Sequence, residues 1–156
     1  MIMEELKLNN TVESTSLQYI VVNIGSEQYG INIKYIDNIV RIQRITRVPK
    51  TQPYYKGVIN LRGEIIPVMS IRIKLGLEEE VFTDKSRIII VKVDNASIGI
   101  IVDQVKEVVT LDEDNIESIA VDANDEFSGY INAVGKSKGE LITLIDIIGL
   151  IVEKEN

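Results

Sequence analysis

The sequence predicts a mainly β protein made of two similar small β units. Isoleucine and valine together supply 45 of the 156 residues, and such β-branched side chains pack well on pleated sheets but lose rotamer freedom in helices. Short apolar runs alternate with turn-forming residues, as is typical of short strands. The second half of the chain repeats the apolar spacing of the first, so the fold is expected to contain one β unit twice.

Residues 17–42 predict a hairpin followed by a third strand. LQYIVVNI, residues 17–24, is an apolar run that meets a turn at residues 25–27, after which QYGI returns. In residues 32–42 the apolar side chains recur at nearly helical spacing and then alternate, which indicates a short helical turn that passes into a strand. Two prolines in residues 49–53 then mark a loop.

The most apolar hairpin is predicted at residues 57–71, GVINLRGEIIPVMSI. Arg62 occupies its turn, and Pro67 lies in its second strand, where the missing N–H requires a sheet edge or a bulge. IRIKLG predicts a short helix that ends at Gly76. An acidic loop follows, and RIIIVKV and SIGIIV then predict a further hairpin around Asp94-Asn95.

Matched positions indicate an internal duplication. A shift of 69 residues aligns apolar positions between 22 and 42 with apolar positions between 91 and 111, and it places Gly30 on Gly99. A shift of 72 then aligns two glycines and an asparagine of the hairpin at 57–63 with those at 129–135. A turn four residues longer would align the strands that follow. These matches predict two copies of one architecture.

The two repeats are expected to span residues 17–76 and 86–152. Each has about five short strands, which is enough to close a small barrel. The expected fold therefore contains two five-stranded barrel-like lobes, short helices and a C-terminal helix. Residues 1–16 are polar and aperiodic and are expected to form a flexible tail, and residues 153–156 a short C-terminal tail.

Composition disfavours several classes of function. A net charge of −7 and a pI near 4.7 argue against nucleic-acid and anionic membrane surfaces as partners. The absence of cysteine excludes disulfides and thiol chemistry, and the absence of histidine excludes the common catalytic triads. No signal peptide is visible, and the longest apolar segment, residues 141–152, contains an aspartate and is too short to span a bilayer. We expect a cytoplasmic protein.

Two weaker motifs give little support for an active or metal site. GKSKG at 135–139 lacks the earlier glycine of a phosphate-binding loop and lies between two strands. The acidic groups at 112–114 and 122–126 lack the glycine of a helix-loop-helix calcium site. We expect no enzyme activity, no cofactor and no metal. A small-molecule-binding β domain, or a minor hydrolase that uses paired carboxylates, stays open as the alternative.

Arg62 needs an explanation of its own. At the shift of 72 its equivalent is Val134, so this alignment suggests that the fold does not require an arginine there. One interpretation is a solvated side chain at a hairpin tip. The other is an interface residue, because arginine combines an aliphatic stem with five donors and is enriched at binding hot spots. Ile33 and Ile36 match apolar residues of the second repeat and are expected to be at least partly core.

GVINLRGEIIPVMSIRIKLG closely resembles the signature of CheW, the coupling-protein family of bacterial chemotaxis. The resemblance extends to YGINIKYIDNIVRI, ITRVPKTQPYYKG, IGIIVDQVKEVV and GELITLIDIIGLI, and it covers approximately residues 17–152. The regulatory domain of the histidine kinase CheA and the N-terminal part of CheV share this fold. The resemblance implies one CheW-like domain at 17–152, built from two SH3-like five-stranded β barrels and lacking catalytic activity.

The resemblance also implies partners and a binding surface. Such proteins connect the cytoplasmic tip of a chemoreceptor to the regulatory domain of CheA, so recruitment to membrane receptor arrays is expected without direct membrane insertion or nucleic-acid binding. In the family, the receptor-contacting surface involves the arginine of this hairpin and the segment after the second strand. Many members carry glutamate at the position of Asn38. The implied partner-binding residues are Arg62, Ile36, Asn38, Ile33, Val58 and Gly57.

Overall fold

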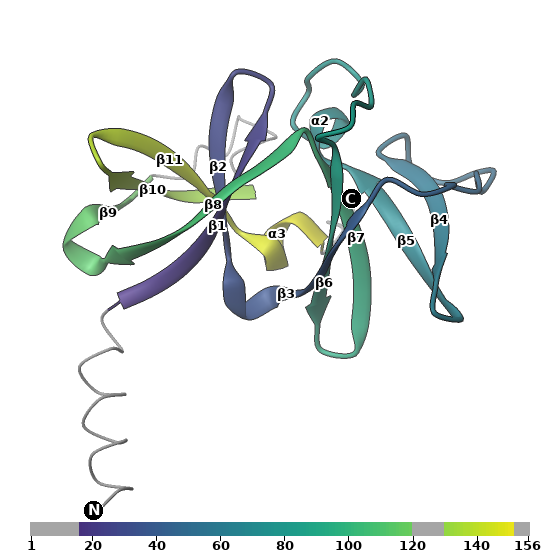
Figure 1. The fold of residues 1–156 in the computed structure, drawn as a ribbon, viewed down its shortest axis with the longest axis horizontal. Helices are drawn as coiled ribbons and strands as arrows, with labels where there is room; N and C mark the ends of the chain where they lie inside the picture. The colour runs from purple at the N-terminus through teal and green to yellow at the C-terminus, as the bar shows by residue number, and fades with distance from the viewer. Residues whose placement is uncertain (1–15, 120–129, 152–156) are drawn as a thin grey trace, which may run out of the picture.

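A computed structural model describes residues 16–119 and 130–151 of the chain, which form two β sheets lying side by side with a short helix between them (Figure 1). The strands are β1 (Ser16–Ile24), β2 (Glu27–Asn32), β3 (Ile36–Arg41), β4 (Tyr55–Leu61), β5 (Glu64–Ser70), β6 (Arg87–Val93), β7 (Ala96–Val102), β8 (Gln104–Asp112), β9 (Ile116–Ser118), β10 (Ile131–Ser137) and β11 (Glu140–Ile145). The helices are η1 (Ile33–Tyr35), α2 (Ile71–Lys74), η2 (Glu113–Asn115) and α3 (Ile147–Ile151).

The predicted mainly β fold with two lobes is confirmed. The hairpins predicted in the first repeat, the helical turn before β3 and the C-terminal helix are all present. The helix predicted at 71–76 is α2, whose N-cap Ser70 accepts a hydrogen bond from the Ile73 N–H and which ends before Gly76 at a φ of 78°. Ser16 opens β1, one residue inside the predicted tail. Residues 1–15 and the tail predicted at 153–156 lie outside the described residues.

The two repeats exchange strands. One sheet has the order β8-β1-β2-β11-β10-β9 and the other β3-β6-β7-β5-β4. Each sheet therefore combines the first hairpin of one repeat with the later strands of the other repeat. Strands of the two repeats meet at two places in each sheet. The pairs are parallel for β2 with β11 and β5 with β7, and antiparallel for β1 with β8 and β3 with β6. Separating the two repeats would break strand pairs in both sheets, so the repeats form one structural unit.

The register of the second hairpin corrects the sequence alignment. β4 and β5 meet at Leu61 and Glu64, and β10 and β11 meet at Ser137 and Glu140. Bulges also fall at the same place in both hairpins, between Tyr55 and Gly57 and between Ile131 and Ala133. The shift is thus 76 throughout, and the proposed shift of 72 for the first strand was wrong. The structural equivalent of Arg62 is Lys138, not Val134.

Aliphatic side chains form three clusters that follow this architecture. One small cluster lies within each sheet, around Val21 and Leu144 in the first and around Ile66 and Ile88 in the second. The largest cluster lies between the sheets and draws buried side chains from both repeats. Each fully buried isoleucine contributes about 1.5–3 kcal/mol relative to exposure, so this shared core holds the lobes in a fixed arrangement.

Lys74 at the end of α2 adds a polar link between the repeats. Its side chain is buried, its Nζ donates to the carbonyl oxygen of Leu150 at 2.5 Å, and it lies 4.1 Å from the ring centre of Tyr54 and 5.2 Å from that of Tyr130. The two tyrosines are equivalent in the repeats at the shift of 76. A cation at the C-terminus of α3 is also favoured by the helix dipole.

A second polar link joins α2 to the start of β8. Arg72 donates to Asp103 through Nε at 3.0 Å and Nη2 at 2.6 Å, and the Gly25 N–H donates to the same carboxylate at 2.8 Å. Burial alone raises the pKa of Asp103, but these hydrogen bonds outweigh it and hold the pKa below its usual value. The charged form of Asp103 therefore stabilises the fold.

We expect the Arg72–Asp103 pair to contribute to the loss of stability at acid pH, which we call the acid limb. Because the pKa of Asp103 is lower in the folded chain, its contribution is complete above about pH 4 and is lost as pH falls through the folded value. Asp103→Asn should lower the free energy of unfolding at neutral pH and flatten its decline below about pH 4. Urea unfolding of both proteins across this range measures the effect. The exposed Asp84→Asn serves as control, and an unchanged acid limb in Asp103→Asn would contradict the assignment.

Candidate partner-binding surface

The predicted site residue Arg62 lies in the turn between β4 and β5. The turn is Arg62-Gly63, with φ values of 56° and 84°, the geometry that suits the right-handed twist of a two-residue hairpin. Asn60 Oδ1 accepts the Gly63 N–H at 3.0 Å and braces it. Lys138-Gly139 repeats this conformation in the second hairpin, with φ values of 53° and 79°. The backbone shape is therefore a property of the fold and not of Arg62.

One face of the β4–β5 hairpin is apolar and open to solvent. Ile59 and Ile66 point into the core of the sheet, so the alternate residues face outward. The cross-strand pairs on this face are Val58 with Pro67 and Asn60 with Ile65. Ile65 is 60% exposed. We call this face together with the tip the hairpin surface, and its residues are Val58, Asn60, Arg62, Ile65 and Pro67.

Pro67 does not lie on an edge strand, because β5 is paired with β4 on one side and β7 on the other. The pairing with β7 begins only at Val68, one residue later. Val58, opposite Pro67, uses its own N–H and C=O for hydrogen bonds of 2.8 Å with Thr46. The expected edge is therefore local: β5 behaves as an edge at Pro67 and as an interior strand beyond it.

The Arg62 side chain is exposed, and within the described residues it makes no hydrogen bond or ion pair. Its planar fork of five donors is thus open beside the apolar Ile65. Lys138, its equivalent, lies 3.7 Å from the Glu107 carboxylate through Nζ. The two turns have the same backbone conformation, and Arg62 and Lys138 have the same positive charge. Within the described chain, however, only the Lys138 side chain has an ionic partner.

The other predicted site residues lie in two separate places. Ile33 in η1 is 37% exposed, Ile36 in β3 is half-buried against the central core, and half-buried Asn38 accepts the Ile39 N–H through Oδ1 at 2.9 Å. β3 and β4 are the two ends of their sheet in strand order. Strand pairing therefore does not bring Ile33, Ile36 and Asn38 together with Arg62.

Gly57 has an architectural role. Its φ is 142°, and a Cβ placed there would lie 2.1 Å from the carbonyl oxygen of Thr46. The residue is buried beneath the segment at Thr46, so its conformation serves the fold, and its part in partner binding stays a prediction. Half-buried Val58 stays on the hairpin surface. Ile65, which the prediction missed, is its most exposed apolar residue. Strand alternation would have found it, since Ile65 and Ile66 must face opposite sides.

The described residues contain few features of an active site. No group of three or more carboxylates among them is arranged to hold a metal ion. Two carboxyl groups there have displaced pKa values, and both are lowered: that of Asp103 as described, and that of Glu140 by hydrogen bonds from Gln28 and Lys106. A general acid would need a raised value. The acidic group at 122–126 lies outside the described residues.

Two further findings complete this description. Burial, followed by the nearby Glu27 carboxylate, raises the pKa of Tyr29 to about 12, so its hydroxyl is protonated at neutral pH and donates to Glu27 at 3.3 Å. Among the helices that the structure describes, none has the length and apolar character needed to cross a membrane.

The comparisons with known proteins agree with one another. The CheW-like domain model matches residues 18–155. The chain is 34% identical to the chemotaxis protein CheW of Bacillus subtilis, covering 91% of this chain and 90% of the relative, and 32% identical to that of Thermotoga maritima, covering 83% and 84%. It is also similar to the crystal structure of the scaffolding protein TtCheW from Thermoanaerobacter tengcongensis. The TM-score is 0.77 and the identity 32%, with coverage of 84% of this chain and 89% of that one.

Proposed function

The chain belongs to the CheW-like family, and from this premise we propose that it is a non-catalytic adaptor of bacterial chemotaxis that holds a chemoreceptor tip and the regulatory domain of the kinase CheA together. In this proposal the protein is cytoplasmic and is recruited to membrane receptor arrays through the receptor. The observation that carries the proposal is the Asn-Leu-Arg-Gly hairpin with its unpaired Arg62 guanidinium beside the exposed Ile65.

The hairpin surface supports receptor binding by a simple physical argument. A receptor tip is a helical hairpin, and a helix can lay an apolar stripe along Val58, Ile65 and Pro67. Arg62 would then donate to carbonyl or carboxylate oxygens at the edge of the contact. A specific contact needs only about 800 Å² on each partner, and modest affinity suffices because arrays are multivalent. Ile33, Ile36 and Asn38 stay proposed as further contact residues.

The strand exchange supports the coupling role. Since both sheets contain strands from both repeats and share one core, a partner bound to one lobe has a fixed orientation relative to a partner bound to the other. The protein would therefore act through geometry, by holding two signalling proteins at a set distance and angle. No chemical step is needed.

Pull-down of the full chain with a receptor tip fragment and with the CheA regulatory domain, separately and together, tests the proposal. We expect the chain to bind each one alone and to bring the two into one complex that does not form without it. Failure to bind either, combined with thermal stabilisation by a metabolite or a metal ion, would favour the small-molecule alternative instead.

A further inference from the structure

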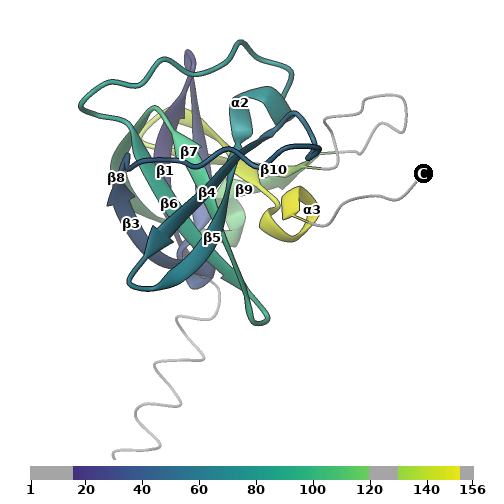
Figure 2. The same ribbon diagram turned by 90° about the vertical axis from the view of Figure 1, so that its right-hand side faces the viewer.

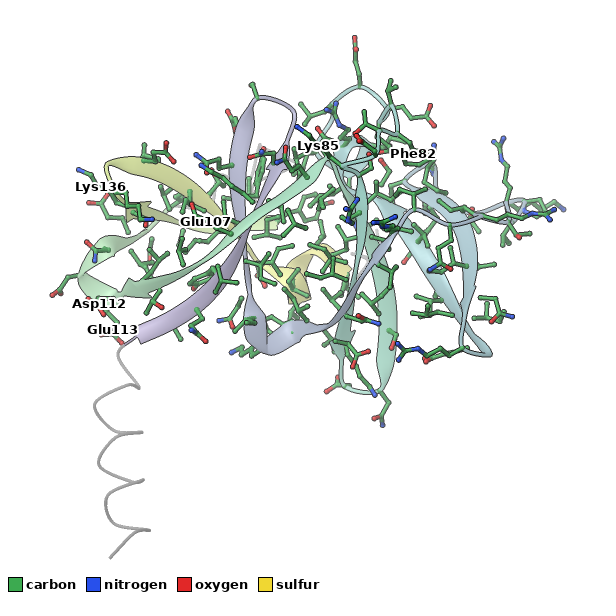
Figure 3. All side chains as sticks on the ribbon, viewed as in Figure 1. Phe82, Lys85, Glu107, Asp112, Glu113 and Lys136 are labelled. Atoms are coloured by element: carbon green, nitrogen blue, oxygen red, sulfur yellow. The ribbon has the colours of Figure 1, made fainter. Side chains whose placement is uncertain are left out.

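The lobe that carries the hairpin surface also contains a strongly basic segment. Between Asn38 and Gly63 the chain has six lysines and arginines and no aspartate or glutamate, although its net charge is −7. At the shift of 69, Asn38 corresponds to Glu107 in the second repeat. Residues 107–126 have eight acidic residues and no basic one. Glu107, Asp112 and Glu113 mark that acidic lobe in Figure 3. Equivalent parts of the duplicated fold thus carry opposite charge.

Most cations of the basic segment have no ionic partner. Lys56 is the exception, since its Nζ pairs with Glu79 and lies 3.5 Å from Glu80 Oε1. Arg41, Arg44, Arg47 and Lys50 are exposed, and in the part of the chain that the structure describes their side chains make no hydrogen bond or ion pair. Internal ion pairing therefore does not account for these four charges.

A cavity of about 510 Å³ opens beside Arg47. Its apolar wall includes the rings of Tyr55 and Phe82 and the side chains of Ile45 and Ile73, and the Lys56–Glu79 pair completes the lining. Lys56 is shared between Glu79 and Glu80, so Arg47 is the cation of the lining that has no acidic partner in the described chain. The volume lies within the range of ordinary ligand sites and admits one bulky side chain.

The wall of this cavity is anchored. The loop that carries Phe82 is fixed at Glu80, whose buried carboxylate accepts from Ser70 Oγ at 2.6 Å. The Leu77 N–H donates to the Arg72 carbonyl at 2.8 Å, and the Thr83 N–H donates to Ser86 Oγ at 2.9 Å. A loop held at several points loses little freedom when a partner binds.

The cavity is distinct from the hairpin surface. Tyr55 begins β4 and Arg62 follows its end, and a strand of seven residues spans roughly 20 Å. Both views place the loop after α2 at one end of the lobe and the β4–β5 turn at the other, and Phe82 lies at the loop end (Figures 2 and 3). A partner in the cavity would leave Arg62 accessible.

We propose that this cavity and its flanking cations are a docking site for an acidic segment of a partner protein that carries one bulky apolar side chain. The apolar side chain enters between Tyr55 and Phe82, and a neighbouring carboxylate pairs with Arg47, while Arg44 and Lys50 attract the rest of the acidic segment. Charge complementarity selects this occupant, because Arg47, which has no acidic partner in the described chain, lines the same cavity as Tyr55 and Phe82, while the chain as a whole is acidic. Glu79, which lines the cavity, opposes binding by repelling the acidic segment.

The test is a titration of the ¹⁵N-labelled full chain with three synthetic peptides, in which the amide chemical shifts are measured by NMR at each step. The probe peptide has the core Asp-Glu-Leu-Phe-Glu-Asp. A charge-reversed peptide replaces its acidic residues with lysine and arginine, and an apolar-deleted peptide replaces Leu-Phe with Ser-Ser. We expect only the probe peptide to bind, with shifts confined to residues 44–56 and 70–84. Equal binding of the charge-reversed peptide, or no shift at millimolar probe, overturns the proposal.

Two single-charge variants should act in opposite directions. Arg47→Gln should weaken binding of the probe peptide about five- to tenfold, whereas Glu79→Gln should tighten it about two- to fivefold by removing a carboxylate that repels the acidic peptide. Lys92→Gln and Glu113→Gln make the same changes of net charge away from the cavity and should leave binding unchanged. If Arg47→Gln and Lys92→Gln weaken binding equally, only net charge matters and the site is refuted.

Anionic vesicles separate this site from a membrane-binding patch. Vesicles that contain phosphatidylserine should not bind the chain or shift residues 44–56. Vesicle binding that is lost in Arg44→Gln and Arg47→Gln, without binding of the probe peptide, would overturn the protein-docking proposal. No receptor or kinase enters these measurements, so their failure is distinguishable from failure of the adaptor function.

Discussion

Arg62→Ala is expected to weaken binding of a receptor tip fragment about thirty-fold while leaving the fold intact. A truncated hot-spot arginine costs about 2 kcal/mol, which corresponds to that factor. The fold should survive because Arg62 is exposed and makes no hydrogen bond or ion pair within the described residues. Alanine also adopts the left-handed conformation at a cost similar to that of arginine. Isothermal titration calorimetry with the tip fragment measures the affinity, and thermal unfolding checks the fold.

The duplication supplies a matched control. Lys138 occupies the same turn position in the second hairpin, with the same sign of φ, the same charge and an exposed side chain. Lys138→Ala should bind the receptor tip like the parent protein. Equal losses in the two variants would mean that net charge, and not the hairpin surface, governs the affinity. Unchanged binding in a correctly folded Arg62→Ala would remove the basis for assigning the receptor to this surface.

Arg62→Lys separates charge from geometry. Lysine keeps the positive charge but lacks the planar fork of donors. If Arg62 makes a bidentate contact, Arg62→Lys should bind less tightly than the parent protein and more tightly than Arg62→Ala. If Arg62 acts only through its charge, Arg62→Lys should bind like the parent protein.

Local signals in the sequence predicted most strands and turns. The alternation of apolar residues indicated the hairpins of the first repeat, and Gly76 marked the end of α2. The match of Gly30 with Gly99 also held. Gly30 pairs with Leu144 and Gly99 with Val68 in equivalent parallel ladders, where a Cβ would lie 2.8 Å from a neighbouring side chain in both cases. The turns and the apolar alternation depend on local backbone sterics, so a single sequence is enough to predict them, and the duplication made the two matched glycines visible.

The register error in the second hairpin has a clear physical cause. Shifts of 72 and 76 differ by four residues, and a strand moved by an even number of residues keeps every side chain on the same face. Apolar alternation in a chain rich in isoleucine and valine therefore cannot distinguish the two shifts. The turn can: Arg62-Gly63 and Lys138-Gly139 have the same backbone conformation. Anchoring the alignment on those turns would have given the correct equivalents.

The same reasoning could not predict the exchange of strands between the repeats. Pairing of β2 with β11 and of β5 with β7 joins residues more than 25 positions apart, and no local pattern encodes which partner a strand takes. For the same reason, the sequence could not predict how the candidate site residues lie relative to one another. Ile36 and Arg62 belong to one predicted surface, yet β3 and β4 are separated by three strands in the order of their sheet.

Gly57→Ala is expected to lower the free energy of unfolding by about 3 kcal/mol or more. The φ of 142° is a conformation that side-chain-bearing residues rarely adopt, and it costs about 1–3 kcal/mol. The added Cβ would also meet the Thr46 carbonyl oxygen at 2.1 Å, in a place held by two backbone hydrogen bonds between Thr46 and Val58. Overpacking of this kind costs a further 1–3 kcal/mol or so. Urea unfolding monitored by circular dichroism measures the sum.

Gly63→Ala provides the comparison that isolates the contact with Thr46. Gly63 also has a positive φ, 84°, but a Cβ there would meet no atom within 4 Å. Its replacement should therefore cost only about 1 kcal/mol. A large loss for Gly57→Ala with a small loss for Gly63→Ala would show that Gly57 is required by the fold. If Gly57→Ala unfolds like the parent protein and yet fails to bind a receptor tip, the glycine belongs to the binding surface after all, and the packing of Thr46 over it must give way readily.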